Sequence, residues 1–446
     1  LTQNIEAAYE VEATYGNPPD STLSHLGLLD TFDPRMVEMS ITPVPSIGQS
    51  TDTHHASGPI GVTLPLKVAC QGTGWQNILG RAIGRTYASG SSAGTPMKLS
   101  SSVDSLSVLA KDSGGDYTLV GGVVPNEVTL TADYTTGGYI TCEANCTAQY
   151  SEDTSDGDFS GEFYGDDYEN VAFPSAPTSD PLLPTDMTLS YSTKTDVVAA
   201  AQDDDFIKLN MAAGKYVEIG ERYLRIFDAD DTLNTTLAAS AASVPYAGVL
   251  DLTHGDADTI TDVITRINDT GLSSTCVAGS GAGSDKSVNI LKGIYKMTGS
   301  LVEIPGIQST SVDGAEGDMA LWPNLKTVAL KVANNNTAIS GKTGTTWLLN
   351  NSISKGKADV TLDITMTATD ETFYDKYKAG TTIPLIRLDF GASVGSIALT
   401  NGTITAFSRP LTPGGELVDT LSIKFRGSGD YKNYSSYAIS ADWTIA

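Results

Sequence analysis

The chain has 446 residues, which is enough for two or three domains that each bury an apolar core. Its 53 acidic residues outnumber 27 basic ones, and the formal net charge is −26. This balance argues against binding nucleic acid through its phosphates, because such binding needs clustered lysine and arginine.

The acidity has two compatible explanations. In very salty surroundings, dissolved ions screen the repulsion between surface charges. A negative surface can also keep another anion away, such as DNA that must slide past without sticking. The acidic residues are spread through the whole chain, so we expect salt adaptation to be the larger cause.

The sequence shows neither a membrane-spanning segment nor a targeting signal. It contains no run of about 18 apolar residues, the length that a spanning helix needs. Its start lacks a charged region followed by an apolar one, so we expect no signal peptide.

A first β-domain is predicted over residues 1–200. Residues 1–17 are expected to form an arm-like or unstructured start. Residues 62–70 alternate apolar with polar or small side chains, which predicts a long half-buried strand. A short amphipathic helix follows, with Trp75, Ile78, Leu79 and Ile83 on one face. Further strands are expected near residues 36–41, 105–110, 117–124, 128–134 and 139–149.

The segment 152–169 predicts an exposed acidic loop or linker at the end of this domain. It holds eight acidic residues and no basic one, and four prolines follow it within the next fifteen positions.

The pattern changes between residues 203 and 291, where we predict an inserted α+β domain. A helix is expected over residues 260–267, because apolar residues fall there at helical spacing, with Asp258 or Thr259 as its cap. An exposed surface role is one interpretation of the insertion, and a packed spacer is the alternative. A β-hairpin is expected at residues 216–219 and 223–227.

The second β-domain, predicted over residues 294–446, repeats the first. Residues 62–70 are echoed 298 positions later at 360–368, and the same offset pairs Trp75 with Phe373. Both halves give the same order: a long strand, a short aromatic helix, a hairpin and a glycine-led strand. Two unrelated β-domains would also share the alternation, and this is the alternative to true duplication. Shorter matches pair 117–122 with 397–402, at an offset of 280, and 138–140 with 415–417, at an offset of 277.

These patterns define the expected fold class. We predict a mainly β chain with two related β-sandwich or barrel domains, each carrying a short helix, and a small inserted α+β domain.

The search for chemistry assembles no set of catalytic, cofactor-binding or metal-binding residues, so we predict no enzyme. Residues 391–395 have Gly-x-Ser-x-Gly spacing, but a nucleophile elbow needs a following helix and a strand is expected here. Residues 341–343 are Gly-Lys-Thr, but Asn336 stands where a phosphate loop needs its first glycine. Asp228, Asp230 and Asp231 begin like a calcium loop, but Leu233 replaces the turn glycine and no Glu closes the loop. A solvated acidic turn is expected there, with a weak cation site as the alternative.

The four cysteines are expected to be buried thiols. Cys142 and Cys146 share one face of a strand and lie roughly 13 Å apart along it, which is too far for a disulfide. The four histidines are not near them in the sequence, so no zinc site is indicated.

Two resemblances to known families follow from these segments. Residues 259–268 (Thr-Ile-Thr-Asp-Val-Ile-Thr-Arg-Ile-Asn), with the strand and Ser/Gly turn after them, resemble the "IN" motif of flagellin and hook-associated proteins. That motif marks a small domain displayed outside a tubular filament. The resemblance therefore implies a surface position for the insertion.

The two repeats resemble the tail tube proteins of long-tailed viruses. A long strand, a short aromatic helix, an apolar strand and a closing alternating strand match the β-sandwich core of that family. The insertion at 203–291 and the acidic segment at 152–169 depart from its pattern. The similarity lies in residues 9–16, 26–34, 359–378, 383–390 and 419–425.

This second resemblance implies a structural virion protein of the tail, assembled in the host cytoplasm. Tail tube subunits form rings that stack into a hollow tube, through which the genome passes into the host. Single-domain members form sixfold rings, whose closure removes exposed strand edges. A chain with two copies is expected to form a ring from three subunits, with pseudo-sixfold symmetry. DNA would pass through the lumen without specific binding, and other tail proteins would contact the tube ends.

Together with the acidity, this resemblance predicts a virus of a halophilic archaeon. One alternative is a secreted or surface-layer β-repeat adhesion protein of a halophile, against which the missing signal peptide counts. Another is a different virion component, such as a distal tail or capsid-decorating protein.

Overall fold

The fold, described from a computed structural model, is mainly β, as the sequence predicts. Three α-helices occur among the described residues, and none of them is long and apolar enough to cross a membrane. The structure describes residues 5–12, 14–16, 23–32, 37–44, 54–83, 105–112, 114–154, 173–193, 206–230, 232–237, 243–244, 247–279, 287–306, 319–343, 346–354, 356–391, 393–410, 415–427, 434–436 and 438–443.

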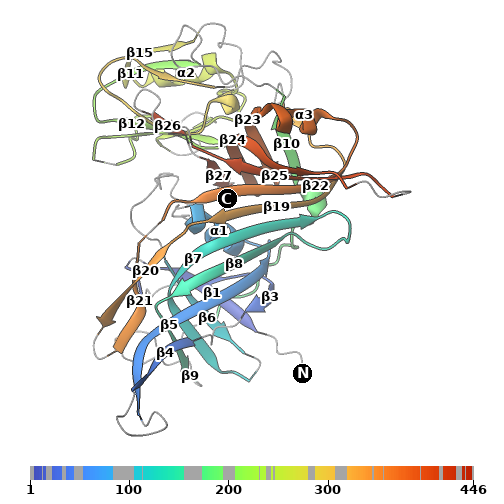
Figure 1. Cartoon of the computed structure of the whole chain (residues 1–446). Helices are drawn as coiled ribbons and strands as arrows, with labels where there is room; N and C mark the ends of the chain where they lie inside the picture. The colour runs from blue at the N-terminus through green and yellow to red at the C-terminus, as the bar shows by residue number, and fades with distance from the viewer. Residues whose placement is uncertain are drawn as a thin grey trace. The chain divides into compact units, whose positions relative to one another are not determined.

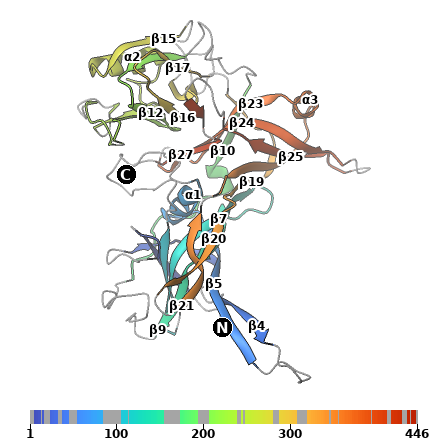
Figure 2. The same ribbon diagram turned by 60° about the vertical axis from the view of Figure 1, so that its left-hand side comes forward.

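The chain forms two compact units, whose elements are labelled in Figures 1 and 2. The division predicted from the sequence, at 1–200, 203–291 and 294–446, stays a prediction. The first unit contains Leu1–Tyr87, Leu99–Pro184 and Ala329–Asp359, and the second contains Ala88–Lys98, Thr185–Val328 and Val360–Ala446.

In the first unit, an antiparallel sheet is built around the long strand β5 (His54–Ala69). Val62, Leu64, Leu66 and Val68 alternate along β5 and are all buried, which explains why this segment forms a strand. The pairing runs from β5 to β8 (Thr141–Ala148), then to β7 (Tyr117–Asp133), β6 (Leu106–Lys111) and β1 (Glu6–Val11). Helix α1 (Gly74–Ile83) follows β5. The shorter strands are β2 (Ser24–His25), β3 (Leu29–Phe32), β4 (Val37–Val44) and β9 (Tyr150–Thr154).

The arm-like start expected for residues 1–17 is wrong for β1, which is a buried and paired strand. Ala7 and Ala8 are fully buried within it. Glu12, which directly follows β1, fixes the end of this segment. Its carboxylate accepts hydrogen bonds from the hydroxyls of Ser105 and Ser107, at 2.5 and 2.6 Å. It also accepts one from the backbone N–H of Gly122 at 2.8 Å. Two small alanines and a single carboxylate give too weak a pattern for the sequence to predict this strand.

The strands expected at 117–124 and 128–134 are one continuous strand, β7. Its register against β8 shifts between Pro125 and Glu127, which marks a β-bulge. Proline has no N–H to donate, and a bulge accommodates it within a sheet. The sequence shows the bulge as a break between two strands.

The acidic segment 152–169 is only partly described. Residues 152–154 belong to β9, where Glu152 lies opposite Leu119 of β7. The rest of the predicted acidic loop, 155–169, lies outside the described residues.

A hairpin that the sequence analysis did not predict also belongs to the first unit. It consists of β20 (Thr337–Thr343) and β21 (Thr346–Ser354). β21 runs parallel to β5, with Leu348 opposite Ile60. Serine, threonine and asparagine are frequent in this hairpin, so it lacks the alternation that identified the other strands.

The second unit contains a sheet with the same order of connections. The pairing runs from β22 (Asp359–Thr367) to β25 (Val418–Phe425), then to β24 (Gly395–Ser408), β23 (Thr382–Asp389) and β10 (Thr188–Ser192). Helix α3 (Thr372–Ala379) follows β22, as α1 follows β5. A bulge interrupts β24 between Ile404 and Ala406. When the bulge of β7, between Pro125 and Glu127, is shifted by the repeat offset of 280 positions, it falls within one residue of this bulge. The second unit also contains β18 (Met319–Leu321) and β27 (Ile439–Trp443), while the 3-10 turn η1 (Pro184–Asp186) and β19 (Leu325–Ala333) each span a boundary between the two units along the chain.

Individual hydrogen bonds outside the strand ladders repeat at matching positions in the two sheets. The N–H of Ala69 donates to the carbonyl of Leu28 at 2.9 Å, and 298 positions later the N–H of Thr367 donates to Asn324 at 3.0 Å. Alternation alone does not produce such matches, so the two sheets share their connections as well as their strand order. Two further pairs of backbone N–H to carbonyl bonds match in the same way. The bond from Cys70 to Ile140 corresponds to the bond from Ala368 to Leu417, and the bond from Leu26 to Ala7 corresponds to the bond from Trp322 to Leu189.

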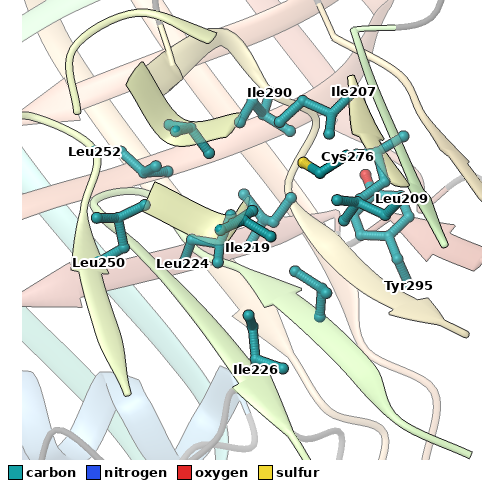
Figure 3. Packing of buried hydrophobic residues seen from close by; sticks show 14 of the residues in the cluster. Ile207, Leu209, Ile219, Leu224, Ile226, Leu250, Leu252, Cys276, Ile290 and Tyr295 are labelled. Carbon is teal, nitrogen blue, oxygen red and sulfur yellow. The ribbon is translucent and has the colours of Figure 1, made fainter. Parts of the chain in front are cut away.

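Between β10 and β18, residues 206–306 form a module with its own apolar core, shown in Figure 3; we call it the inserted module. It holds two small antiparallel sheets, the second of which is completed by a strand from later in the chain. One pairs β11 (Ile207–Met211) with β15 (Ser273–Ala278) and β17 (Val302–Ile304). The other consists of β14 (Val249–Asp251), β13 (Tyr223–Phe227), β12 (Tyr216–Ile219), β16 (Gly293–Lys296) and β26 (Tyr434–Ser436), and the 3-10 turn η2 (Ser287–Asn289) precedes β16.

The helix and the hairpin predicted for the insertion are both confirmed. The hairpin is β12–β13, and the helix is α2 (Ile260–Asp269), which places Val263 and Ile267 in the core. Thr259 caps the helix: its hydroxyl accepts from the N–H of Asp262 at 3.3 Å, and the Asp262 carboxylate accepts from the N–H of Thr259 at 3.1 Å. This reciprocal capping box explains why the helix begins here.

Because Leu64 and Leu362 are matched positions of β5 and β22 and both are fully buried, truncating either should cost similar stability. We expect Leu64→Ala and Leu362→Ala each to lower the free energy of unfolding by about 2–5 kcal/mol. Urea unfolding followed by tryptophan fluorescence measures the loss. Asp363→Ala, on the exposed face of β22, is the control and should change stability by less than about 0.5 kcal/mol. An equal loss in the control would contradict the burial pattern of β22.

Candidate functional site

The structure does not bring the motifs with catalytic spacing together into a site. Residues 391–395 lead into β24, so a strand follows Ser393 where a nucleophile elbow needs a helix. Residues 341–343 lie in strand β20 and not in a loop before a helix. The carboxylate of Asp228 binds Lys215 and accepts from the Asn234 amide at 2.9 Å, and these contacts lower its pKa. Asp228 is therefore held by the chain's own side chains.

The cysteines do not form a metal site or a disulfide. All four are free and buried, as predicted, and burial raises the pKa of each thiol. Among the residues that the structure describes, no three His, Cys, Asp or Glu side chains lie close enough to hold a metal ion.

A cluster of buried charged side chains surrounds the turn between β12 and β13. Glu221, at this turn, is 2% exposed and makes an ion pair with the guanidinium of Arg387 on β23. The ammonium of Lys292, which precedes β16, lies 4.0 Å from the other carboxylate oxygen and is 1% exposed. A turn of the inserted module thus places a carboxylate between a cation of its own and a cation of the repeated sheet.

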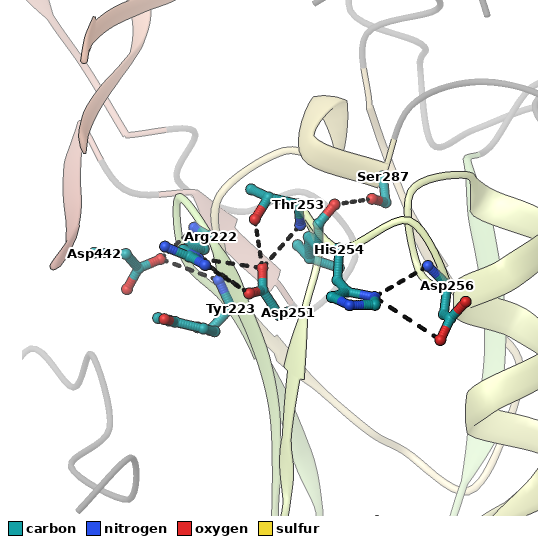
Figure 4. A network of polar contacts seen from close by, with 9 residues as sticks. Arg222, Tyr223, Asp251, Thr253, His254, Asp256, Ser287 and Asp442 are labelled. Atoms are coloured by element: carbon teal, nitrogen blue, oxygen red, sulfur yellow. Dashed lines mark hydrogen bonds and ion pairs between the residues drawn. The ribbon is translucent and has the colours of Figure 1, made fainter. Parts of the chain in front are cut away.

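A second carboxylate, that of Asp442, also contacts this turn, as Figure 4 shows. Asp442 of β27 accepts from the backbone N–H groups of Arg222 and Tyr223, at 2.5 and 3.2 Å. It also lies 3.7 Å from the guanidinium of Arg225. The side chain of Arg222 turns the other way and binds both oxygens of Asp251, at 2.8 to 3.2 Å. We call these residues the turn cluster: Glu221, Arg222, Arg225, Asp251, Lys292, Arg387 and Asp442.

Burial dominates the electrostatics of the turn cluster. Desolvation raises the pKa of Glu221, although Arg387 and Lys292 oppose the shift. Desolvation also lowers the pKa of Lys292 to about 8, against the opposing effect of Glu221. Perturbed pKa values of this kind are frequent at catalytic sites, but they also occur in structural ion pairs. Glu221 and Lys292 are almost completely buried, and the contacts of the cluster join the β12–β13 turn to β23 and β27.

The sequence analysis missed the turn cluster. Glu221 and Arg222 stand between two predicted strands, where charged residues normally face water. Their partners Arg387 and Asp442 are more than 160 positions away, and nothing in one sequence connects them. One signal was present: Arg387 is a lone cation inside the apolar run 383–390, and a charge in a buried strand requires a partner.

Comparison with known proteins adds little to this description. No model of a known protein family matches the chain, and no curated protein resembles it. Among solved structures, one similar chain belongs to a structure described as "Virion of native gene transfer agent (GTA) particle". The two chains are 13% identical with a TM-score of 0.20, and the similarity covers 28% of this chain and 88% of that one. A likeness at this level carries no argument about function.

Removing the cation from the buried pair at the turn should be costly, because a buried carboxylate then loses its bound partner. We expect Arg387→Met to lower the free energy of unfolding by about 3–5 kcal/mol. Adding Glu221→Gln should restore much of the loss, since the unpaired charge is then gone. Lys326→Met is the matched control: it breaks an ion pair with Glu416 that is partly exposed, and should cost less than about 1 kcal/mol. A control loss as large as that of Arg387→Met would contradict the assigned role.

The lowered pKa of Lys292 makes stability depend on pH in a defined direction. Between pH 8 and 10.5 the unfolded chain holds the Lys292 proton and the folded chain has released it. The unfolded state then binds more protons, so this group stabilises the fold as pH rises through that window, and the gain is lost as pH falls to about 8. Lys292→Met should remove this rise in urea unfolding experiments. Lys296→Met, on the exposed side of β16, should behave as the wild type, and a variant at position 292 that keeps the rise would contradict the assignment.

Proposed function

We propose that this chain is a structural subunit of a virus particle, and more specifically a subunit of the rings that stack into a hollow tail tube. The observation that carries the proposal is the strand-for-strand correspondence of the two sheets, from β5 through β8 and from β22 through β25. A chain with two equivalent sheets presents two equivalent edges. Equivalent edges are what a ring with twice as many sheets as subunits requires.

The edges of the two sheets support this role. β2 pairs with β1, and β18 pairs with β10. Leu321 of β18 is 69% exposed. An unpaired edge with an exposed apolar side chain favours aggregation unless another chain covers it. Pairing around a closed ring would satisfy such edges in every subunit.

The proposed mechanism is passive conduction of DNA. The net charge of −26 makes adhesion of DNA phosphates to the tube unfavourable, and salt keeps the repulsion short-ranged. No catalytic role is proposed, because no set of catalytic residues is apparent in the sequence and the perturbed pair Glu221 and Lys292 is enclosed. The acidity also supports a host that lives in concentrated salt.

Electron microscopy of the purified chain tests this proposal. We expect stacked rings or tubes with a central channel in molar salt, and three subunits per ring with pseudo-sixfold symmetry. In dilute buffer the rings should loosen, because like charges on neighbouring subunits are then poorly screened. Rings with six chains would rule out the threefold arrangement. Flat sheets would favour a surface-layer protein, and monomers at every salt concentration would exclude assembly altogether.

A further inference from the structure

The helices of the two repeats occupy matched places but differ in exposure. α1 is buried along its whole length, from Gly74 to Ile83. In α3, 298 positions later, Phe373 alone is buried. Gln76 and Leu79 are 4% and 0% exposed, whereas the matched residues are 37% exposed (Tyr374) and 38% exposed (Tyr377). The same element of the same fold is thus covered in one repeat and open in the other.

The open face of α3 carries aromatic side chains where a solvated helix face normally carries polar ones. The ring centroids of Tyr374 and Tyr377 lie 5.3 and 6.1 Å from that of Phe407 on β24. The ammonium of Lys378 lies 4.7 Å from the Tyr374 ring centroid, and the guanidinium of Arg409 lies 5.6 Å from that of Phe407. We call Tyr374, Tyr377 and Phe407 the α3 patch. Aromatic residues flanked by cations are enriched at the centres of protein interfaces.

We infer that the α3 patch is a docking surface for a second copy of this chain. The inference rests on the proposed self-assembly, and it names the surface involved. Its first support is the repeat itself, since α1 shows that this fold buries the matched face of its helix. Its second support is charge: three bases beside the patch (Lys376, Lys378 and Arg409) balance three acids (Asp370, Glu371 and Asp375), whereas the whole chain has a net charge of −26. A second copy therefore meets less like-charge repulsion at this surface than the net charge of the chain would impose.

A thiol-protection experiment locates the interface without altering the patch. All four native cysteines are buried, so one introduced cysteine is the accessible thiol of the folded chain. Asp375→Cys places it beside the patch, at the position matched to Asn77, which is 2% exposed in α1. Leu301→Cys, at a residue that is 48% exposed in the inserted module, is the control. A maleimide reagent is applied to the full-length chain as a monomer and as the assembly.

We expect the thiol at position 375 to react in the monomer and to react at least about tenfold more slowly in the assembly, as a buried interface residue would. The thiol at position 301 should react at similar rates in both. Assembly with no protection at position 375 would overturn the inference and leave the proposed self-assembly standing. Failure to assemble under any condition would overturn both.

A second variant tests whether the patch contributes binding energy. Tyr374→Ser combined with Tyr377→Ser should raise the concentration needed for half-assembly at least about tenfold, measured by analytical ultracentrifugation. The exposed positions of the two tyrosines mean that the folded monomer should keep its circular dichroism spectrum and melting temperature. Val277→Ser, at a residue that is 45% exposed on β15, is the matched control and should assemble like the wild type. Normal assembly of the double variant would overturn the inference.

Discussion

Each repeated sheet depends on hydrogen bonds between its first long strand and its last one. β5 pairs with β8 along eight residues, and β22 pairs with β25 along eight residues. These strands are separated in the sequence by a helix and two further strands, so the pairing closes a long loop and is entropically expensive. The alternating apolar side chains of both partners offset that cost. Everything between them, including the position of α1 or α3, follows from this closure.

The two units contain sheets with the same strand order but differ in what is attached to those sheets. In the first unit, the carboxylate of Glu12 gathers hydroxyl and amide donors around the start of the chain and thereby fixes β1. In the second unit, the matched place between β10 and β22 has accepted the inserted module. The module carries its own apolar core, and polar contacts join its β12–β13 turn to β23 and β27. An insertion with its own core can be added to a sheet without repacking that sheet.

The sequence predicted those elements of the fold in which apolar residues recur at the regular spacing of a strand or a helix. The long strands, the capped helix α2 and the β12–β13 hairpin each have a local pattern of apolar residues, and the structure contains them. The repeat offset of 298 also matches hydrogen bonds that no alternation could reveal, such as those donated by Ala69 and Thr367. The sequence did not predict β1, whose small side chains give little contrast, or the β20–β21 hairpin, which is rich in serine, threonine and asparagine. It also missed the turn cluster, because the partners of Glu221 are set by tertiary folding. The α3 patch became visible when the exposure of two matched helices was compared.

Enclosure of the turn cluster has a consequence for how stability responds to salt. Mobile ions weaken contacts between charges that water can reach, and in molar salt the Debye length falls to about 3 Å. Glu221 and Arg387 are each less than 5% exposed, so counter-ions do not come between them. An attachment made of such pairs keeps its strength as the salt content of the medium rises and falls, while the acidic exterior responds to every change. A change in salt concentration would therefore alter the repulsion between acidic surfaces without loosening the inserted module from β23 and β27.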